Sequence, residues 1–493
     1  MMLASNSKAF LALLFLPVLL VGYAITRICY NLFWHPLRKF PGPLLARATI
    51  ITYQWKSLQG FSHKWLQHLH EKYGPVVRCS PNELSIIEPA VWKDIYGHRA
   101  TSFVKEPEFY GEDAYGSPAG IIRADNFHHG LQRKLVSHAF SDKALRDQEQ
   151  CLQGYVALLI ERLKEASMKG AADMVEWYNF TTFDIMADLT FGESLGQLNT
   201  STYSPWVKAT FSFLKVVSIM RVCRSWPGIA MLLQALVPAD VQKKRETHIA
   251  FTKDRVNERM ARKTDRPDIW TLITKYDEGK GLEPGELHNN GLTFMVAGTE
   301  TTATLLSGLT YLLLKNPIKL NRLTTEVRTA FSSFDDMTMS KLSQLTYLNA
   351  CLNEGLRMYP PVPAGLPRRT PDSGAMVCGH WVAGGTIIQC PMYAAFHSSK
   401  NWTEPETFAP ERFLPENEKQ YSHDRKDVFN PFSYGPRNCL GKNLAYHEMR
   451  LILASVLLHF DLKLSDPTDQ WLDQEVHILW EKGPLFVTLT RVK

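Results

Sequence analysis

The sequence lacks the features that mark several common classes of protein. It has 8 cysteines among 493 residues, and no two of them form a Cys-x-x-Cys pair. This argues for a reducing compartment rather than a disulfide-bonded scaffold, and it leaves no motif for zinc or an iron–sulfur cluster. No Gly-x-Gly-x-x-Gly fingerprint is present either. The chain therefore shows no dinucleotide-binding unit of its own.

Charge is also sparse and weakly biased. Asp, Glu, Lys and Arg make up 21% of the chain, and the net charge of +6 is small for this length. No basic tract is interleaved with aromatic residues, so we expect no nucleic-acid partner. No Gly/Ser linker, charge block or internal repeat divides the chain. With 45% hydrophobic residues it can bury a large core, and we expect one large catalytic domain although length alone allows about three domains.

An uncharged stretch lies near the start of the chain. Residues 9–25 carry no charge and are at the short end of the roughly 17 to 25 residues that span a bilayer as a helix. A cleaved signal peptide is the alternative. The positive charges that follow, Arg27, Arg38, Lys39 and Arg47, outnumber Lys8 before the stretch, which would keep the large domain cytoplasmic.

A proline-rich segment, residues 36–43, follows this stretch and predicts a rigid spacer. We therefore expect residues 1–40 to form a membrane anchor and hinge that takes no part in the core. Residues 41–493 would form the catalytic domain.

One cysteine stands in a setting that suits a metal ligand. Cys439 lies in Phe-Ser-Tyr-Gly-Pro-Arg-Asn-Cys-Leu-Gly, residues 432–441, and residues 442–460 then place apolar side chains at helical spacing. The sulfur should lie near a helix N-terminus, where the dipole and unpaired N–H groups favour a thiolate. A lone thiolate suits the axial ligation of haem iron. A buried structural cysteine is the alternative, although chance would give the whole pattern only about once in ten thousand chains.

A second chemical feature lies in an apolar segment, residues 286–315, that predicts a helix of roughly 45 Å. Between residues 287 and 314 its only acidic or basic side chain is Glu300, apart from His288. Burying an unpaired carboxylate costs several kcal/mol, so Glu300 should be protonated, paired or functional. It lies within Ala-Gly-Thr-Glu-Thr-Thr, residues 297–302, a composition that favours a bend able to hold water. A kink without function is the alternative.

These two motifs resemble those of the cytochrome P-450 family. The pattern Phe-x-x-Gly-x-Arg-x-Cys-x-Gly is similar to the family's haem-binding loop, and Ala-Gly-Thr-Glu-Thr-Thr is similar to its oxygen-binding motif. The resemblance implies that Cys439 ligates the iron of haem b and that Glu300 and Thr301 form a proton relay. It also implies contacts to the cofactor from Phe432 beside the sulfur, Gly435 and Gly441 beside the porphyrin, Arg437, Arg368 and Arg133 at the propionates, and His129, which stands where tryptophan is usual.

A third motif is Glu-x-x-Arg, formed by Glu354 and Arg357 on a predicted helix, residues 348–359. Such a pair is usually a surface ion pair. Pro-Glu-Arg-Phe follows at residues 410–413, and the resemblance implies a buried structural triad of Glu354, Arg357 and Arg412 that supports the haem loop. It further implies an apolar substrate pocket lined by Phe294, Ala297, Val362, Ala364, Leu366, Leu485 and Phe486.

The resemblance covers nearly the whole chain, because the motifs occur in the family's order and follow an anchor and hinge. It implies the cytochrome P-450 fold, mainly α with small β-sheets and preceded by one transmembrane helix. The most similar members are microsomal enzymes of secondary metabolism in filamentous fungi, including relatives of the isotrichodermin hydroxylases.

The implied function is a monooxygenase that inserts one oxygen atom from O2 into an apolar intermediate of terpenoid or polyketide type. Electrons would come from NADPH through a separate cytochrome P-450 reductase. The enzyme would be a single-pass protein of the endoplasmic reticulum membrane with its catalytic domain in the cytoplasm. Two alternatives are a haem-thiolate isomerase or dehydratase that uses no O2, and a non-enzymatic haem-binding sensor.

Overall fold

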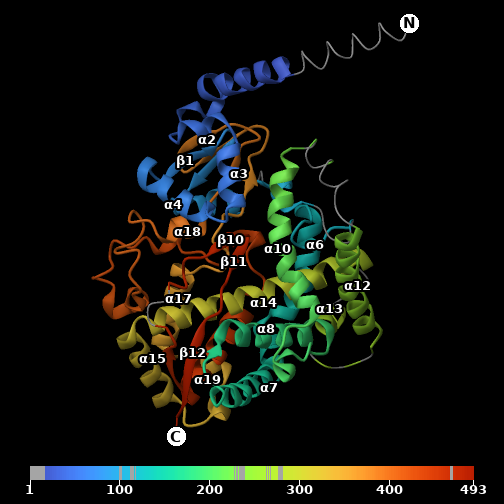
Figure 1. Ribbon diagram of the computed structural model, residues 1–493, viewed down its shortest axis with the longest axis vertical. Coiled ribbons are helices and arrows are strands. Elements are labelled where there is room, and N and C mark those ends of the chain that lie inside the picture. The colour runs from blue at the N-terminus through green and yellow to red at the C-terminus, as the bar shows by residue number, and fades with distance from the viewer. Residues whose placement is uncertain are drawn as a thin grey trace.

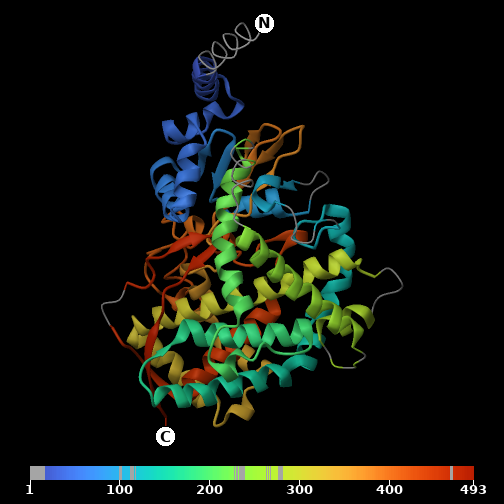
Figure 2. The same cartoon turned by 45° about the vertical axis from the view of Figure 1, so that its right-hand side comes forward.

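The computed structural model describes residues 17–492 except 99–102, 112–115, 117, 227, 229–230, 232–238, 263, 265, 267, 276–280 and 467–469. Helices form most of this part of the chain, and the strands form four small sheets. A helical segment at the N-terminus projects from one end of the body, and the C-terminus lies at the opposite end (Figures 1 and 2). The predicted class, mainly α with small sheets, is confirmed.

The largest sheet joins the N-terminal part of the chain to residues after 367. Its strand order is β1-β2-β8-β5-β3, in which β2 and β8 are parallel and the other neighbours are antiparallel. The strands are β1 (Val76–Ser80), β2 (Glu83–Ile86), β3 (Val104–Lys105), β5 (Arg368–Arg369) and β8 (Ile387–Gln389). Helices α2 (Leu44–Ala48), α3 (Ile51–Leu58) and α4 (Ser62–Tyr73) lie beside it.

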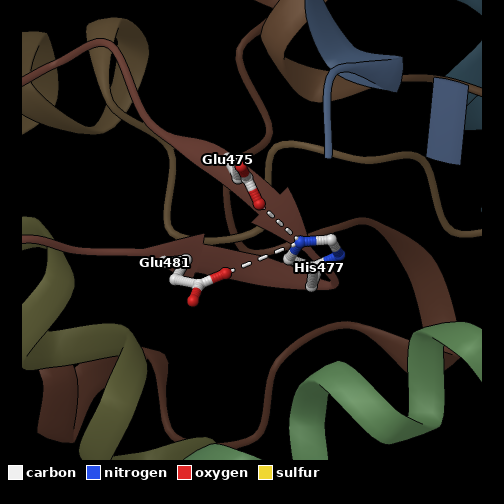
Figure 3. A group of neighbouring side chains, drawn as sticks. All are labelled: Glu475, His477 and Glu481. Carbon is white, nitrogen blue, oxygen red and sulfur yellow. Dashed lines mark hydrogen bonds and ion pairs between the residues drawn. The ribbon is translucent and has the colours of Figure 1, made fainter. Parts of the chain in front are cut away.

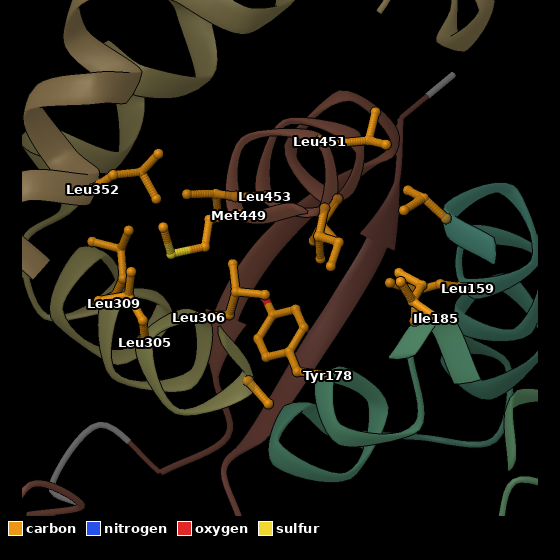
Figure 4. Close-up of a cluster of buried hydrophobic side chains, with 14 of the residues drawn as sticks. Leu159, Tyr178, Ile185, Leu305, Leu306, Leu309, Leu352, Met449, Leu451 and Leu453 are labelled. Atoms are coloured by element: carbon orange, nitrogen blue, oxygen red, sulfur yellow. The ribbon is translucent and has the colours of Figure 1, made fainter. Parts of the chain in front are cut away.

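The main core is a bundle of long helices around α14 (Pro284–Leu314), which crosses the middle of the molecule (Figure 1). It packs against α8 (Met174–Phe191), α17 (Thr346–Met358) and α19 (Lys442–His459), while α7 (Asp142–Ser167) packs on α8 and α19. Figure 4 shows side chains from all five helices meeting in one apolar cluster: Leu159, Tyr178, Ile185, Leu305, Leu306, Leu309, Leu352, Met449, Leu451 and Leu453. This packing holds α14 in place along its length.

The ends of α14 follow from its sequence. Glu283 and Glu286 form a capping box, and Pro284 occupies the first turn, where its missing N–H costs no hydrogen bond. The helix ends two residues before Asn316, and Pro317 starts the next helix. The predicted helix at residues 286–315 is therefore confirmed, with a start two residues earlier.

Most other elements surround this core. The helices are α5 (Pro107–Tyr110), α6 (Asn126–Val136), α9 (Gln197–Thr200), α10 (Pro205–Arg224), α12 (Ala239–Ala261), α13 (Ile269–Lys275), α15 (Pro317–Ala330), α16 (Met339–Ser343) and α18 (Met392–Phe396). The remaining strands are β4 (Ala172–Asp173), β6 (Ala375–Val377), β7 (His380–Val382), β9 (Phe460–Leu464), β10 (Glu475–His477), β11 (Leu479–Glu481) and β12 (Phe486–Arg491). Strands β10 and β11 form a hairpin, and β12 pairs with β4 and β9.

Residues just before position 40 pack on the domain, contrary to the prediction that they take no part in the core. Leu37 is 1% exposed and belongs to a cluster with the first sheet. The Asn31 carbonyl accepts a hydrogen bond of 2.9 Å from Arg78, and the Asn31 amide donates to the Ala48 carbonyl. Proline composition predicted a spacer, but these apolar and amide groups attach the segment to the domain.

One helical segment, Pro17–Trp34, is long and apolar enough to cross a membrane, with a mean hydropathy of 1.2 and 6% of it buried. Length and composition alone make it a candidate span. It overlaps the predicted anchor at residues 9–25, of which residues 9–16 lie outside the described residues.

Candidate functional site

The Cys439 loop is closed by its own backbone. The Cys439 N–H donates to the Phe432 carbonyl across 2.8 Å, and α19 begins at Lys442, three residues after the cysteine. Phe432 lies beside Tyr446 of α19, with ring centroids 5.2 Å apart. The Cys439 side chain keeps exposed surface although protein surrounds it closely enough to desolvate the thiol. Cys439 therefore keeps surface that a ligand can reach.

Burial raises the pKa of the Cys439 thiol above its usual value. The Gly441 amide, Arg133 and Lys442 act in the opposite direction, but burial outweighs them. The N–H group at the start of the helix thus favours the thiolate as expected, although burial has the larger effect on the pKa. A metal cation at the sulfur would reverse the balance, because a coordinating thiol is deprotonated.

The two glycines of the loop differ in what the protein requires of them. Gly435 has a φ of +73°, and a Cβ there would lie 2.0 Å from the Tyr96 carbonyl oxygen. A side chain at this position is therefore excluded by the protein itself. At Gly441 a Cβ would meet nothing closer than 3.9 Å. A porphyrin close to Gly441 stays a prediction.

Two arginines near the loop have buried nitrogen atoms that find no hydrogen-bond partner among the described residues. Arg437 donates to the Ala124 carbonyl and to Asn126, but its Nη1 is unpaired. Arg368 is 5% exposed, lies over the Tyr96 ring and has an unpaired Nε. Unpaired buried donors are rare and costly, and a bound anion would accept hydrogen bonds from these nitrogen atoms.

The surroundings of His129 show that this region is strongly cationic. Burial and the nearby cations Arg437, Lys105, Arg133 and Arg368 lower the pKa of His129 to about 3. Of these, Arg133 donates to the carbonyl of Asn438 across 2.6 Å, directly before the cysteine. The structure places His129 close to Arg133, Arg368 and Arg437.

These residues fit the haem implied by the resemblance. The sulfur of the exposed Cys439 would hold the iron, and the Arg368 and Arg437 donors that have no partner among the described residues would suit two carboxylates such as haem propionates. Arg369, which follows Arg368 in the sequence, instead pairs with Glu106 across 2.6 Å. The geometry therefore favours Arg368 over Arg369 as a cofactor contact.

Helix α14 has an accessible face in the middle of its buried length. Ala297 is exposed and Thr301, one turn later, is partly exposed, whereas residues 302–313 are buried. The Thr301 hydroxyl donates to the Ala297 carbonyl across 2.7 Å, which leaves its oxygen free to accept a hydrogen bond. Because α14 packs on α19, which follows Cys439, this face and the sulfur lie on adjoining elements.

Glu300 is buried and paired, one of the states the sequence predicted for it. It forms an ion pair with Lys482, and the side chains of Glu300 and Lys482 are 5% and 4% exposed. Lys482 also donates to the Thr304 hydroxyl across 2.8 Å. Sequence reasoning missed Lys482, which lies 182 positions away and carries no motif of its own.

The predicted triad is present and fully buried. Arg357 donates to Glu354 from Nε and Nη2, both at 2.8 Å, and Arg412 reaches the same carboxylate at 3.1 Å. Asp424, which sequence reasoning missed, completes the group through a 2.5 Å contact to Arg412. The network connects α17 to the segment that leads into the Cys439 loop.

The predicted pocket residues fall into two groups. Ala297, Val362, Ala364 and Leu366 keep accessible surface. In contrast, Phe294 and Leu485 are 6% and 0% exposed and belong to the main core. The Leu485 amide donates to Asp173, and Phe486 is 50% exposed in β12. Only the first group and Phe486 offer surface to a ligand in this conformation.

The β10–β11 hairpin carries a separate cluster of possible metal ligands, Glu475, His477 and Glu481 (Figure 3). His477 Nε2 lies 3.0 Å from Glu475 and 3.6 Å from Glu481. Lys215 of α10 pairs with both carboxylates, at 3.9 and 3.0 Å. An ammonium group therefore already compensates their charge, and the cluster joins α10 to the hairpin.

Comparison with known proteins gives a consistent result. A family described as Cytochrome P450 matches residues 41–489. The chain is 45% identical over 476 residues to cytochrome P450 monooxygenase efuB of Hormonema carpetanum, covering 95% of this chain and 94% of that protein. It is also 45% identical over 474 residues to cytochrome P450 monooxygenase FUM2 of Gibberella moniliformis, covering 94% and 100%. Cytochrome P450 monooxygenase tpeC of Talaromyces stipitatus is 44% identical over 483 residues, covering 96% and 94%.

Proposed function

The chain belongs to the cytochrome P450 family, whose members use a haem with thiolate-ligated iron, and we propose that it is a membrane-anchored monooxygenase of fungal secondary metabolism. In the overall reaction a C–H bond of the substrate becomes C–OH. One atom of O2 enters the product and the other leaves as water, while NADPH supplies two electrons and a further proton comes from solvent. An isomerase or dehydratase of the same family would need neither O2 nor NADPH.

The observation that carries the proposal is the setting of Cys439. Its sulfur has exposed surface inside the fold, and nearby Arg368 and Arg437 keep buried donors without partners. When bound there, haem supplies the activation of O2. The protein's part is to hold the cofactor through Cys439 and the arginines, with Phe432 beside the loop. Glu354, Arg357 and Arg412 would keep the preceding segment rigid.

Glu300 and Thr301 are the residues we assign to proton delivery. Glu300 is the acidic side chain in the middle of α14, and Thr301 follows it on the accessible face of the helix. A carboxylate can take a proton from water and release it to a neighbouring hydroxyl, which is a common form of general acid–base catalysis. The oxygen of Thr301 accepts that proton, and the hydrogen that it donates to the Ala297 carbonyl in this structure turns away and is passed on to the oxygen being reduced.

The substrate is proposed to be a mostly apolar molecule of terpenoid or polyketide type. Ala297, Val362, Ala364 and Leu366 present apolar side chains with accessible surface. Small-molecule pockets are usually lined by such groups, with few polar ones. Phe486, which is exposed on β12, is the remaining candidate contact.

We place the enzyme in the endoplasmic reticulum membrane, with its catalytic domain cytoplasmic and electrons delivered by NADPH–cytochrome P450 reductase. The candidate span Pro17–Trp34 supports this, and so do exposed apolar residues that follow it in α2 and α3, among them Leu44, Ile51 and Trp55. Because Asn31 and Leu37 pack on the domain, we propose that the catalytic domain begins at about residue 31 rather than 41.

The proposal is tested with purified protein, reductase and NADPH under isotopically heavy O2. Terpenoid and polyketide intermediates from fungal cultures serve as substrates. We expect NADPH-dependent O2 consumption and products that carry one heavy oxygen atom. Product formation without O2 would favour the isomerase or dehydratase, and binding of haem without turnover of any compound would favour the sensor.

A further inference from the structure

Lys482 connects the β10–β11 hairpin to the middle of α14. It follows β11 directly, and its ammonium group contacts Glu300 Oε1 and the Thr304 hydroxyl, one helical turn apart. The lysine side chain is 4% exposed and the glutamate side chain 5%. A contact so deeply buried is not the usual surface ion pair, whose contribution is small.

The hairpin is held so that Lys482 has little freedom to move away. Two residues earlier, Trp480 stacks on Tyr359 with ring centroids 4.5 Å apart, and its indole N–H donates to the Pro360 carbonyl across 2.8 Å. Tyr359 in turn packs against Gly308 of α14, where a Cβ would lie 2.2 Å from the ring. The backbone that carries Lys482 is thus fixed against the same helix that carries Glu300.

The charges of this pair depend on each other. Either group left alone in the interior would cost several kcal/mol, whereas together they compensate. The contact also orients the carboxylate, because Oε1 is occupied by Lys482 while Oε2 is buried and has no hydrogen-bond partner among the described residues. Oε2 is therefore the oxygen left to receive a proton.

We propose that Lys482 is a positioning residue for Glu300 and sets the efficiency of proton delivery. This inference rests on the proposed monooxygenase function and on the role of Glu300 within it. Lys482 holds Oε1, so that Oε2 is the oxygen that accepts a proton from water, and the positive charge of Lys482 favours release of that proton toward Thr301. After the transfer Glu300 is again a carboxylate paired with Lys482, and no net charge is left in the interior.

The test compares the fate of NADPH electrons in the wild type and in Lys482→Met, with reductase, O2 and an alkoxycoumarin as probe. When protons arrive late, reduced oxygen leaves as hydrogen peroxide. We expect Lys482→Met to lower the rate of probe oxidation about tenfold, less than the 100-fold or more of a direct acid or base. The share of NADPH recovered as peroxide should rise several-fold. Lys482→Arg, which keeps the charge and the donors, should restore most of the coupling.

Two controls separate positioning from general damage. Lys215→Met removes an exposed lysine that pairs with the same hairpin, and it should change the peroxide share less than about twofold. The reaction driven by added hydrogen peroxide needs no delivered protons, because peroxide supplies the oxygen atom, the electrons and the protons. Its rate should be the same in Lys482→Met as in the wild type, which also shows that the variant is folded and binds haem.

A double variant gives the sharpest outcome. If Lys482 acts through Glu300, Lys482→Met combined with Glu300→Gln should be no slower than Glu300→Gln alone. Additive losses, or an unchanged peroxide share in Lys482→Met, would overturn the role of Lys482 and leave the monooxygenase function intact. A wild type that consumes no O2 with NADPH and reductase would instead contradict the proposed function. If Lys482→Met fails to fold, Lys482→Gln replaces it in the same comparison.

Discussion

Arg369 forms an ion pair with Glu106, with 2.6 Å between Nη2 and Oε1, whereas its neighbour Arg368 has a buried Nε without a partner in the described part of the chain. The two arginines should therefore respond differently to substitution. Arg368→Gln should lower haem affinity about tenfold or more, since a hydrogen bond to a charged group contributes about 1.5 to 3 kcal/mol. Arg369→Gln is the matched control and should leave haem affinity unchanged. Transfer of haem to apomyoglobin measures both, and equal losses would contradict the assignment.

The position where the catalytic domain begins predicts the effect of shortening the chain at its N-terminus. A protein that begins at Tyr30 keeps Asn31 and Leu37 and should unfold at the same temperature as the full chain in detergent. One that begins at Phe40 loses the hydrogen bond to Arg78 and the buried Leu37 side chain, for which truncation typically costs about 2 to 5 kcal/mol. Both should partition less with membranes. Equal unfolding temperatures for the two shortened proteins would show that Asn31 and Leu37 add no stability.

The buried network around Glu354 predicts a large loss of stability from one substitution. Arg412→Met leaves Glu354 and Asp424 with less compensation, and breaking a buried pair costs about 3 to 5 kcal/mol. The matched control is Arg162→Met, which removes a partly exposed pair with Glu165 at the same spacing of three residues as Glu354 and Arg357. It should cost about 1 kcal/mol or less. Urea unfolding and haem content measure both, and similar losses would rule out a supporting role.

The sequence predicted most of the fold because local signals carry it. The helix at α14 follows from a long apolar run, and between residues 287 and 314 Glu300 is the only acid, which makes it conspicuous from composition alone. The motif around Cys439 contains Arg437. The resemblance to the family predicted the positions of Arg133 and Arg368.

What the sequence could not predict depends on contacts between distant segments. Lys482 pairs with Glu300 across 182 positions, and nothing around Lys482 marks it as a partner of α14. Asp424 joins the triad from a loop without a motif. The helix N-terminus favours the Cys439 thiolate as expected, but the burial that raises the pKa of the thiol is determined only by the fold. Leu37 was predicted to belong to a spacer because prolines dominate the composition of residues 36–43.

The accessible face of α14 predicts where substrate binding is sensitive to size. Ala297→Phe should block binding or shift the position of oxidation, because Ala297 is exposed on the face that carries Thr301. Leu366→Phe should act similarly. Leu485→Phe is the control: the leucine is fully buried in the core, so overpacking should cost about 1 to 3 kcal/mol of stability without a new product. Product analysis and thermal unfolding separate the effects, and wild-type products from both pocket variants would contradict the proposed pocket.

The central claim is that the Cys439 sulfur ligates the haem iron, and the spectrum of the reduced protein with carbon monoxide tests it most directly. Wild type and Cys223→Ser, which changes a cysteine on α10 outside the Cys439 loop, should both show the long-wavelength band typical of a thiolate-ligated haem. Cys439→Ser should lose that band, either with haem still bound or with no haem at all. The same long-wavelength band in Cys439→Ser would contradict the assignment.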